Sequence, residues 1–130
     1  MIDHASISVR SLENSARFYH AVLGAIGYAK LVVRPHAVGF GTKYPEFWIN
    51  ARPAMNAADA DTGHHVCLRA KSTAEVEEFH RVALANGGAD GGAPAVRHYT
   101  KSSVFAAFIV DPDGNRVEAL TILPSGENAA

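Results

Sequence analysis

Hydrophobic and polar residues alternate one by one near the start of the chain. Within residues 2–10, Ala5, Ile7 and Val9 fall on one side and mostly polar residues fall on the other. This period of two is typical of a half-buried strand. From Ser11 onward, apolar residues recur every three or four positions until glycines interrupt them, which is the pattern of an amphipathic helix. The opening segment therefore predicts a strand followed by a helix that packs on it.

Three more strands are predicted in the first half of the chain. Runs rich in β-branched and aromatic residues cover 28–34, 36–41 and 46–50, and such runs favour strands. The stretch 51–62 contains a proline, several alanines and polar turn formers. It predicts a linker.

The same order of elements returns after an offset of 61 residues, which indicates an internal repeat. The pairs related by this offset are His4 and His65, Ile7 and Leu68, Ser11 and Ser72, Phe18 and Phe79, Leu23 and Leu84, and Gly27 and Gly88. Residues 65–70 predict a strand. Ser72, with Glu75 three positions later, is a capping box that predicts the start of a helix.

The rest of the second half predicts a small-residue loop and three strands. The loop covers 89–94, and the strands cover 96–99, 104–110 and 116–123. Between the last two strands, Asp-Pro-Asp-Gly-Asn at 111–115 has the composition of a hairpin turn.

Each half therefore has the predicted order β-α-β-β-β, and neither half buries its sheet alone. We expect one α+β domain in which two repeated modules form a curved mixed sheet around a concave site, with the helices outside. The expected boundaries are module one at about 1–50, a linker at 51–62, module two at about 63–123 and a frayed tail at 124–130.

Composition narrows the class of protein. The 130 residues are 48% hydrophobic and 19% charged, with a formal net charge of −1, so no basic excess points to nucleic acid. No apolar run approaches the roughly 20 residues that span a bilayer, and no signal-peptide pattern opens the chain. The single cysteine, Cys67, excludes an internal disulfide and is compatible with a reducing compartment. We expect a cytoplasmic protein.

Three residues carry the candidate chemistry. Alternation places His4 and His65 on the side of their strands away from the helices, and Glu118 puts a carboxylate on an otherwise apolar strand face. Buried charges are paired or bind metals. Two imidazoles and one carboxylate suit non-haem iron, manganese, zinc or nickel. Two alternatives stay open: the histidines are ordinary satisfied residues, or Glu118 pairs with Arg69 or Arg97 across the sheet.

Several motifs together resemble a known family. They are Ile2-Asp3-His4, Ser-Ala-Arg-Phe-Tyr at 15–19, Val-Leu-Gly at 22–24, Gly-His-His-Val at 63–66 and Asp-Pro-Asp-Gly-Asn-Arg-Val-Glu at 111–118. Over about residues 1–122 the chain resembles the vicinal oxygen chelate superfamily, which includes glyoxalase I, bleomycin-resistance and fosfomycin-resistance proteins and extradiol dioxygenases. The resemblance implies one divalent metal ion (Fe, Mn, Zn or Ni) held by His4, His65 and Glu118.

The sequence departs from the glyoxalase I pattern at one metal-ligand position. Glyoxalase I has a fourth ligand, Glu or Gln, in the last strand of the first module. That position falls within 47–49 here, most simply at Trp48, and tryptophan cannot bind a metal. Three ligands match the extradiol-dioxygenase and fosfomycin-resistance branches, and this points away from lactoylglutathione lyase activity.

The expected function is that of a metal-dependent enzyme acting on a small substrate that chelates the metal through adjacent oxygens. Lyase, isomerase and ring-cleaving dioxygenase chemistry all remain open. His98 and Tyr99 are candidates for proton transfer, Trp48 and Phe40 for an apolar wall, and Arg69 for substrate binding. The alternative is a metal-independent protein of the bleomycin-resistance type that sequesters a small molecule. The resemblance implies a homodimer and leaves open whether one chain or two complete the site.

Overall fold

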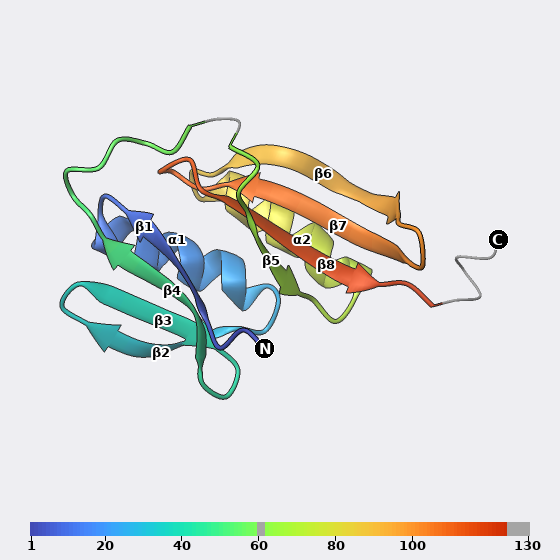
Figure 1. Cartoon of the computed structure of the whole chain (residues 1–130), viewed down its shortest axis with the longest axis horizontal. Coiled ribbons are helices and arrows are strands. Elements are labelled where there is room, and N and C mark those ends of the chain that lie inside the picture. Colours follow the sequence, from blue (N-terminus) through green and yellow to red (C-terminus); the bar gives the residue numbers. More distant parts are fainter. Residues whose placement is uncertain (60–61, 125–130) are drawn as a thin grey trace.

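The computed structural model of the chain describes residues 1–59 and 62–124. It contains two modules, each with one helix and four strands, and Figure 1 shows how they are arranged. Module one contains β1 (Ala5–Val9), α1 (Leu12–Gly24), β2 (Ala29–Arg34), β3 (Ala37–Gly41) and β4 (Pro45–Ala51). Module two contains β5 (Val66–Arg69), α2 (Thr73–Ala85), β6 (Ala89–His98), β7 (Ser103–Val110) and β8 (Arg116–Ile122). The predicted α+β class and repeated β-α-β-β-β order are confirmed. Beyond residue 124, the predicted frayed tail lies outside the described residues.

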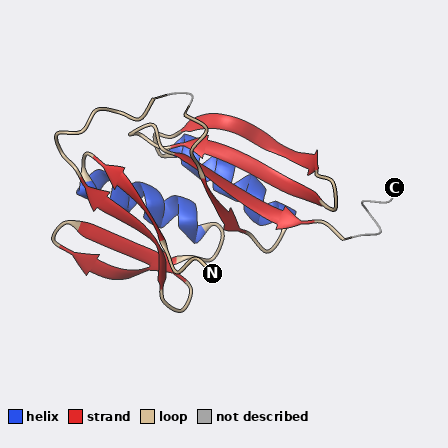
Figure 2. Cartoon of the chain, viewed as in Figure 1, coloured by secondary structure: helices blue, strands red, loops and turns tan. Residues whose placement is uncertain are grey.

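Each module has its own four-stranded mixed sheet. The strand orders are β1-β4-β3-β2 and β5-β8-β7-β6. The first strand of each module pairs in parallel with the last, and the other pairs are antiparallel. In the view of Figure 2, both helices lie behind the strands. We call the sheet face opposite the helix the open face of each module.

Equivalent serines begin the two helices. The side chain of Ser11 accepts a hydrogen bond from the backbone N–H of Asn14, and Ser72 does the same for Glu75. These bonds satisfy backbone donors that a helix start leaves unpaired. The cap predicted at Ser72 is therefore present, and Ser11 is its counterpart in module one. In the parts of the chain described, neither helix is long and apolar enough to cross a membrane.

The predicted loop at 89–94 is wrong, because these residues belong to β6. The strand pairs with β7 through two register shifts, one between Asp90 and Gly92 and one between Gly92 and Ala95. β6 lies at the edge of its sheet, where a proline such as Pro94 removes no needed ladder bond. Glycine and proline therefore produce bulges in this strand and do not end it.

The cores of the two modules join through the helices. α1 contacts α2, and a Cβ atom on Gly88 would lie 2.9 Å from the Phe18 ring. The helix-facing sides of both sheets supply the rest of one continuous apolar cluster. The largest fully buried side chains are Tyr19, Phe40, Phe47, Phe79, Leu23, Ile26, Ile49 and Ile109.

The turn between β7 and β8 also joins the modules. Asp113 Oδ1 accepts hydrogen bonds from the backbone N–H of Arg10 at 3.1 Å and from its Nε at 2.7 Å, and Oδ2 accepts one from Ser15 Oγ at 3.4 Å. Asn115 Nδ2 donates to the carbonyl oxygen of Ser8 at 2.8 Å. A turn of module two therefore holds the start of α1 in module one.

Asp111 extends this contact into the core. The Tyr19 hydroxyl donates to Asp111 Oδ2 at 2.6 Å, and both residues are buried. Burial raises the pKa of Asp111 although its hydrogen bonds act in the opposite direction. Burial, followed by the neighbouring Asp111 charge, raises the pKa of Tyr19. The raised pKa keeps the Tyr19 hydroxyl protonated, so it acts as the donor to Asp111.

Candidate functional site

Glu118 is the carboxylate that the fold buries on the open face of module two. It lies on β8 opposite Cys67 of β5, and its side chain is 4% exposed. Glu118 Oε1 lies 3.1 Å from His65 Nε2. Glu118 Oε2 is buried and accepts no hydrogen bond from residues 1–59 and 62–124. The described contact is therefore with His65, not with the arginines considered as alternative partners, and it involves only one of the two carboxylate oxygens.

His65 and His4 take equivalent positions, each one residue before the first strand of its module. The His65 ring packs edge-on against Phe108, with 5.4 Å between centroids. His4 Nδ1 lies 2.8 Å from Asp3 Oδ2, and the His4 side chain is 52% exposed. The expected pair of equivalent histidines is therefore in place on the two modules.

A cavity of about 390 Å³ is bordered by both His4 and His65, together with Glu46, Cys67 and Arg69. Desolvation, followed by the Glu118 charge, raises the pKa of the Cys67 thiol to about 12, so it is not a thiolate at neutral pH. Within residues 1–59 and 62–124, no three His, Cys, Asp or Glu side chains lie close enough to hold a metal ion. The single chain brings His65 and Glu118 together and leaves His4 apart from them.

Trp48 occupies the position in module one that Glu118 occupies in module two. β1 pairs Ser6 with Trp48, and β5 pairs Cys67 with Glu118. Ser6 and Cys67 are themselves related by the 61-residue repeat. The register therefore agrees with the sequence-based placement of the missing fourth ligand at Trp48.

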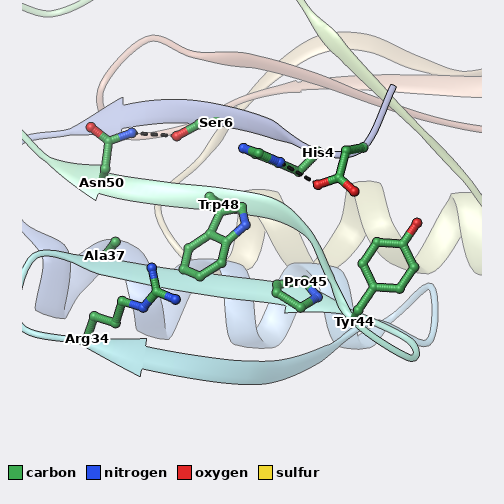
Figure 3. A pocket seen from close by; sticks show the side chains of 9 residues that line it. His4, Ser6, Arg34, Ala37, Tyr44, Pro45, Trp48 and Asn50 are labelled. Carbon is green, nitrogen blue, oxygen red and sulfur yellow. Dashed lines mark hydrogen bonds and ion pairs between the residues drawn. The ribbon is translucent and has the colours of Figure 1, made fainter. Parts of the chain in front are cut away.

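The Trp48 ring lies over a glycine. Gly39 is opposite Trp48 in the β3–β4 pair, and a Cβ atom there would lie 3.0 Å from the indole ring and 2.7 Å from Pro45. The guanidinium of Arg34 lies 4.9 Å from the ring centroid, a favourable cation–π contact. Figure 3 shows this arrangement in a cavity of about 410 Å³.

Module two has the same kind of stack with its residues exchanged between strands. Phe108 of β7 is opposite Glu118, and the Arg97 guanidinium lies 5.2 Å from the Phe108 ring centroid. In module one the aromatic ring is Trp48 of the last strand, β4. In module two it is Phe108 of β7, the strand before the last. Sequence reasoning did not assign either arginine to the site. The sequence feature that could have indicated both residues is an arginine near the end of the second strand of each module, Arg34 in β2 and Arg97 in β6.

The structure corrects the expectation for Phe40. This residue pairs with Phe47, is fully buried and faces Tyr19 at 6.4 Å between ring centroids. It belongs to the core beside α1, because its neighbour Gly39 is the β3 residue on the open face. Trp48 borders the cavity of module one, so only one of the two predicted wall residues lies at a cavity.

The proton-transfer candidates lie at the far end of β6. His98 Nδ1 is 2.8 Å from Ser103 Oγ, and Tyr99 is 54% exposed with its backbone N–H bonded to Ser102. Neither residue borders the cavities described above. Their catalytic role stays a prediction.

Comparison with known proteins gives a consistent result. A family model described as the Glyoxalase/Bleomycin resistance protein/Dioxygenase superfamily matches residues 1–119. No curated protein matches significantly.

Solved structures share the fold over nearly the whole chain. A glyoxalase/bleomycin resistance protein from Albidiferax ferrireducens T118 is 28% identical, with a TM-score of 0.81 over 92% of this chain and 97% of that one. A glyoxalase/bleomycin resistance protein/dioxygenase family enzyme from Burkholderia phytofirmans PsJN is 19% identical, with a TM-score of 0.71 over 94% and 98%. A glyoxalase/dioxygenase from Nostoc punctiforme is 17% identical, with a TM-score of 0.70 over 95% and 92%. The chain belongs to the glyoxalase/bleomycin resistance protein/dioxygenase superfamily.

Proposed function

We propose that the protein is a divalent-metal-dependent enzyme acting on a small substrate that offers two adjacent oxygens to the metal. His65 and Glu118 supply two ligands, and His4 supplies the third. The observation that carries the proposal is the buried Glu118 carboxylate, whose Oε2 accepts no hydrogen bond from any residue that the structure describes.

The chemistry of these donors fits the metal. An unsatisfied buried carboxylate oxygen is costly, because it has lost its water and gained no donor. A cation beside Oε2 removes this cost, and His65 already lies against the other oxygen. One carboxylate and two imidazoles match non-haem iron, and they also suit manganese, nickel and zinc.

A second copy of the chain completes the proposed site. His4 borders a cavity with His65 but forms no three-residue ligand group with it among the described residues. Figure 2 shows both helices on one side of the strands, and no described helix or strand lies in front of the two sheets in this view. In a twofold homodimer the same surfaces meet reciprocally. His4 of one copy then faces His65 and Glu118 of the other, and each dimer holds two equivalent sites.

The residues around the ligands define what the site does. When bound, the metal supplies Lewis-acid or one-electron chemistry at the substrate oxygens. Glu118 provides the anionic ligand, held in place by pairing with both β5 and β7. Trp48 and Phe108 provide apolar surface that excludes water from the bound substrate. Trp48 offers no fourth ligand, so lyase action on a glutathione adduct is not proposed.

Removing His4 tests the ligand assignment. We expect metal-free wild-type protein to bind one metal ion per chain when titrated with Ni²⁺, Mn²⁺ or Zn²⁺ in a calorimeter. We expect His4→Ala to bind the metal at least about 10-fold more weakly. Losing a residue that binds the metal directly has a larger effect than losing a residue that only hydrogen-bonds to a ligand. His20→Ala is the matched control, because His20 is an exposed histidine on α1.

Two outcomes contradict the assignment. Full metal affinity in His4→Ala removes His4 from the site. A wild-type protein that binds no metal, but whose Trp48 fluorescence is quenched by small aromatic ligands regardless of chelator, indicates the sequestering function instead.

A further inference from the structure

We propose that the open face of module two binds an oxyanion of the substrate, a carboxylate or a phosphate, through the guanidinium group of Arg97. Naming this ligand as part of the substrate rests on the proposed function. Anion binding at Arg97 itself needs no metal.

The cavity at this face is bordered by two arginines and two histidines. It has a volume of about 400 Å³, and Arg97, Arg116, His64 and His65 all line it. Among the described residues, no Asp or Glu side chain lines this cavity. Two guanidinium groups beside two imidazoles favour an anionic ligand.

Arg97 is held in place, but no carboxylate in the described parts of the chain acts as its counter-ion. Its guanidinium stacks on the Phe108 ring at 5.2 Å. Its hydrogen bond to the Ala93 carbonyl oxygen is long, at 3.5 Å, and its Nε is buried without an acceptor. In the described parts of the chain, no carboxylate forms an ion pair with it. A partly buried cation without an anion is incompletely compensated, and a ligand oxyanion supplies the missing charge.

Two glycines make room for this arrangement. A Cβ atom on Gly92 would lie 3.1 Å from Arg97 Nη2 and 3.2 Å from the Phe108 ring, and one on Gly91 would lie 3.4 Å from Arg116 Nη1. Both glycines line the cavity. They lie where β6 shifts register against β7. The bulged strand therefore lets both guanidinium groups approach the backbone, with no side chain between them and the cavity.

The corresponding cavity of module one has a different charge pattern. It is bordered by Arg34 but also by the carboxylate of Asp3, which the 61-residue repeat relates to His64 in module two. Of the two open faces, module two is the one that favours an anion. His65 borders the same cavity and packs against the same Phe108 ring. An oxyanion at Arg97 therefore places the rest of a small substrate beside His65 and Glu118.

Titrations of the metal-free protein test the proposal. The protein is stripped of metal with EDTA, and the chelator, itself a carboxylate, is removed by dialysis. Benzoate, its neutral counterpart benzamide, and inorganic phosphate are then added at constant ionic strength, and backbone amide shifts are followed by NMR. We expect benzoate or phosphate to shift the amides of Gly91 and Gly92, and benzamide to leave them in place. The anion with the higher affinity identifies the carboxylate or phosphate form of the ligand.

Variants identify the group responsible. We expect Arg97→Gln to weaken anion binding by roughly 10- to 100-fold, the effect of losing a charge-assisted hydrogen bond. Arg97→Lys keeps part of the affinity because it keeps the charge but not the planar fork. Arg81→Gln, on the exposed side of α2, should bind as wild type does. If Arg97→Gln does not fold, Gly92→Ala displaces the guanidinium without removing charge and should weaken binding as well.

The proposal is overturned if neither anion binds, if benzamide binds as tightly as benzoate, or if folded Arg97→Gln or Gly92→Ala retains wild-type affinity. Because the protein is metal-free, a failure of the proposed metal site does not affect this result. Metal binding with no anion binding overturns only the inference about Arg97.

Discussion

Replacing Glu118 with Gln is expected to abolish metal binding and to leave the metal-free protein at least as stable as wild type. The carboxylate is almost completely buried, and one of its oxygens has no hydrogen-bond partner among the described residues. Glutamine has nearly the same shape and carries no charge, so the desolvation cost falls. Metal affinity should fall by more than about 100-fold, because loss of supporting residues alone costs 10- to 100-fold. This result would mean that Glu118 serves metal binding and lowers the stability of the metal-free protein.

Thermal unfolding with and without added metal measures both effects. Wild-type protein should gain melting temperature with metal, and the variant should gain none while melting at or above the wild-type value without metal. Glu77→Gln, an exposed change on α2, should respond to metal as wild type does. A Glu118→Gln protein that melts well below wild type without metal and still responds to metal would show that Glu118 is a structural residue.

Replacing Asp113 with Ala is expected to lower the free energy of unfolding by about 2–4 kcal/mol. Breaking a buried ion pair typically costs 3–5 kcal/mol. Here the Asp113 side chain is 5% exposed, but Arg10 is 43% exposed, so water partly replaces the lost partner and the effect is smaller. The substitution also removes acceptors from the backbone N–H of Arg10 and the hydroxyl of Ser15.

Urea denaturation checks this expectation. Arg17→Ala is the control, since its pair with Glu13 joins two exposed side chains at 3.4 Å and contributes little. Unfolding of Asp113→Ala at the wild-type urea midpoint would show that the turn at 111–115 serves only its own hairpin and does not hold the two modules together.

The repeat made much of the fold predictable. Hydrophobic periods located both helices and most strands, and the 61-residue offset placed His4 and His65 in equivalent positions. Strand order, compared with the glyoxalase I pattern, placed the missing fourth ligand within 47–49, most simply at Trp48, and the register makes Trp48 equivalent to Glu118. These inferences succeeded because alternation and helix capping are local, so a few neighbouring residues determine them.

Contacts between the modules were not predictable in this way. The turn at 111–115 has the composition of any hairpin, and nothing local indicates that Asp113 binds Arg10. Tyr19 carried one usable signal. It lies on the apolar stripe of α1, and a buried tyrosine hydroxyl requires a partner.

The sheet face on which a residue of a short strand lies was also difficult to predict from the sequence. Phe40 and Trp48 were expected on one wall, but the β3–β4 register puts Gly39 opposite Trp48 and turns Phe40 to the core. A shift of one residue exchanges the faces of a strand. Arg34 and Arg97 were missed because each arginine stacks on an aromatic ring that another strand supplies. Only the assembled sheet brings each arginine to its ring.

Mixing two inactive variants tests the central claim most directly. His4→Ala and Glu118→Gln proteins are unfolded together in equal amounts, refolded, and assayed for bound metal. If His4 of one copy joins His65 and Glu118 of the other, each mixed dimer regains one intact site, and about a quarter of all sites bind metal again. If the mixture binds no more metal than the separate variants, a shared site in a homodimer is contradicted.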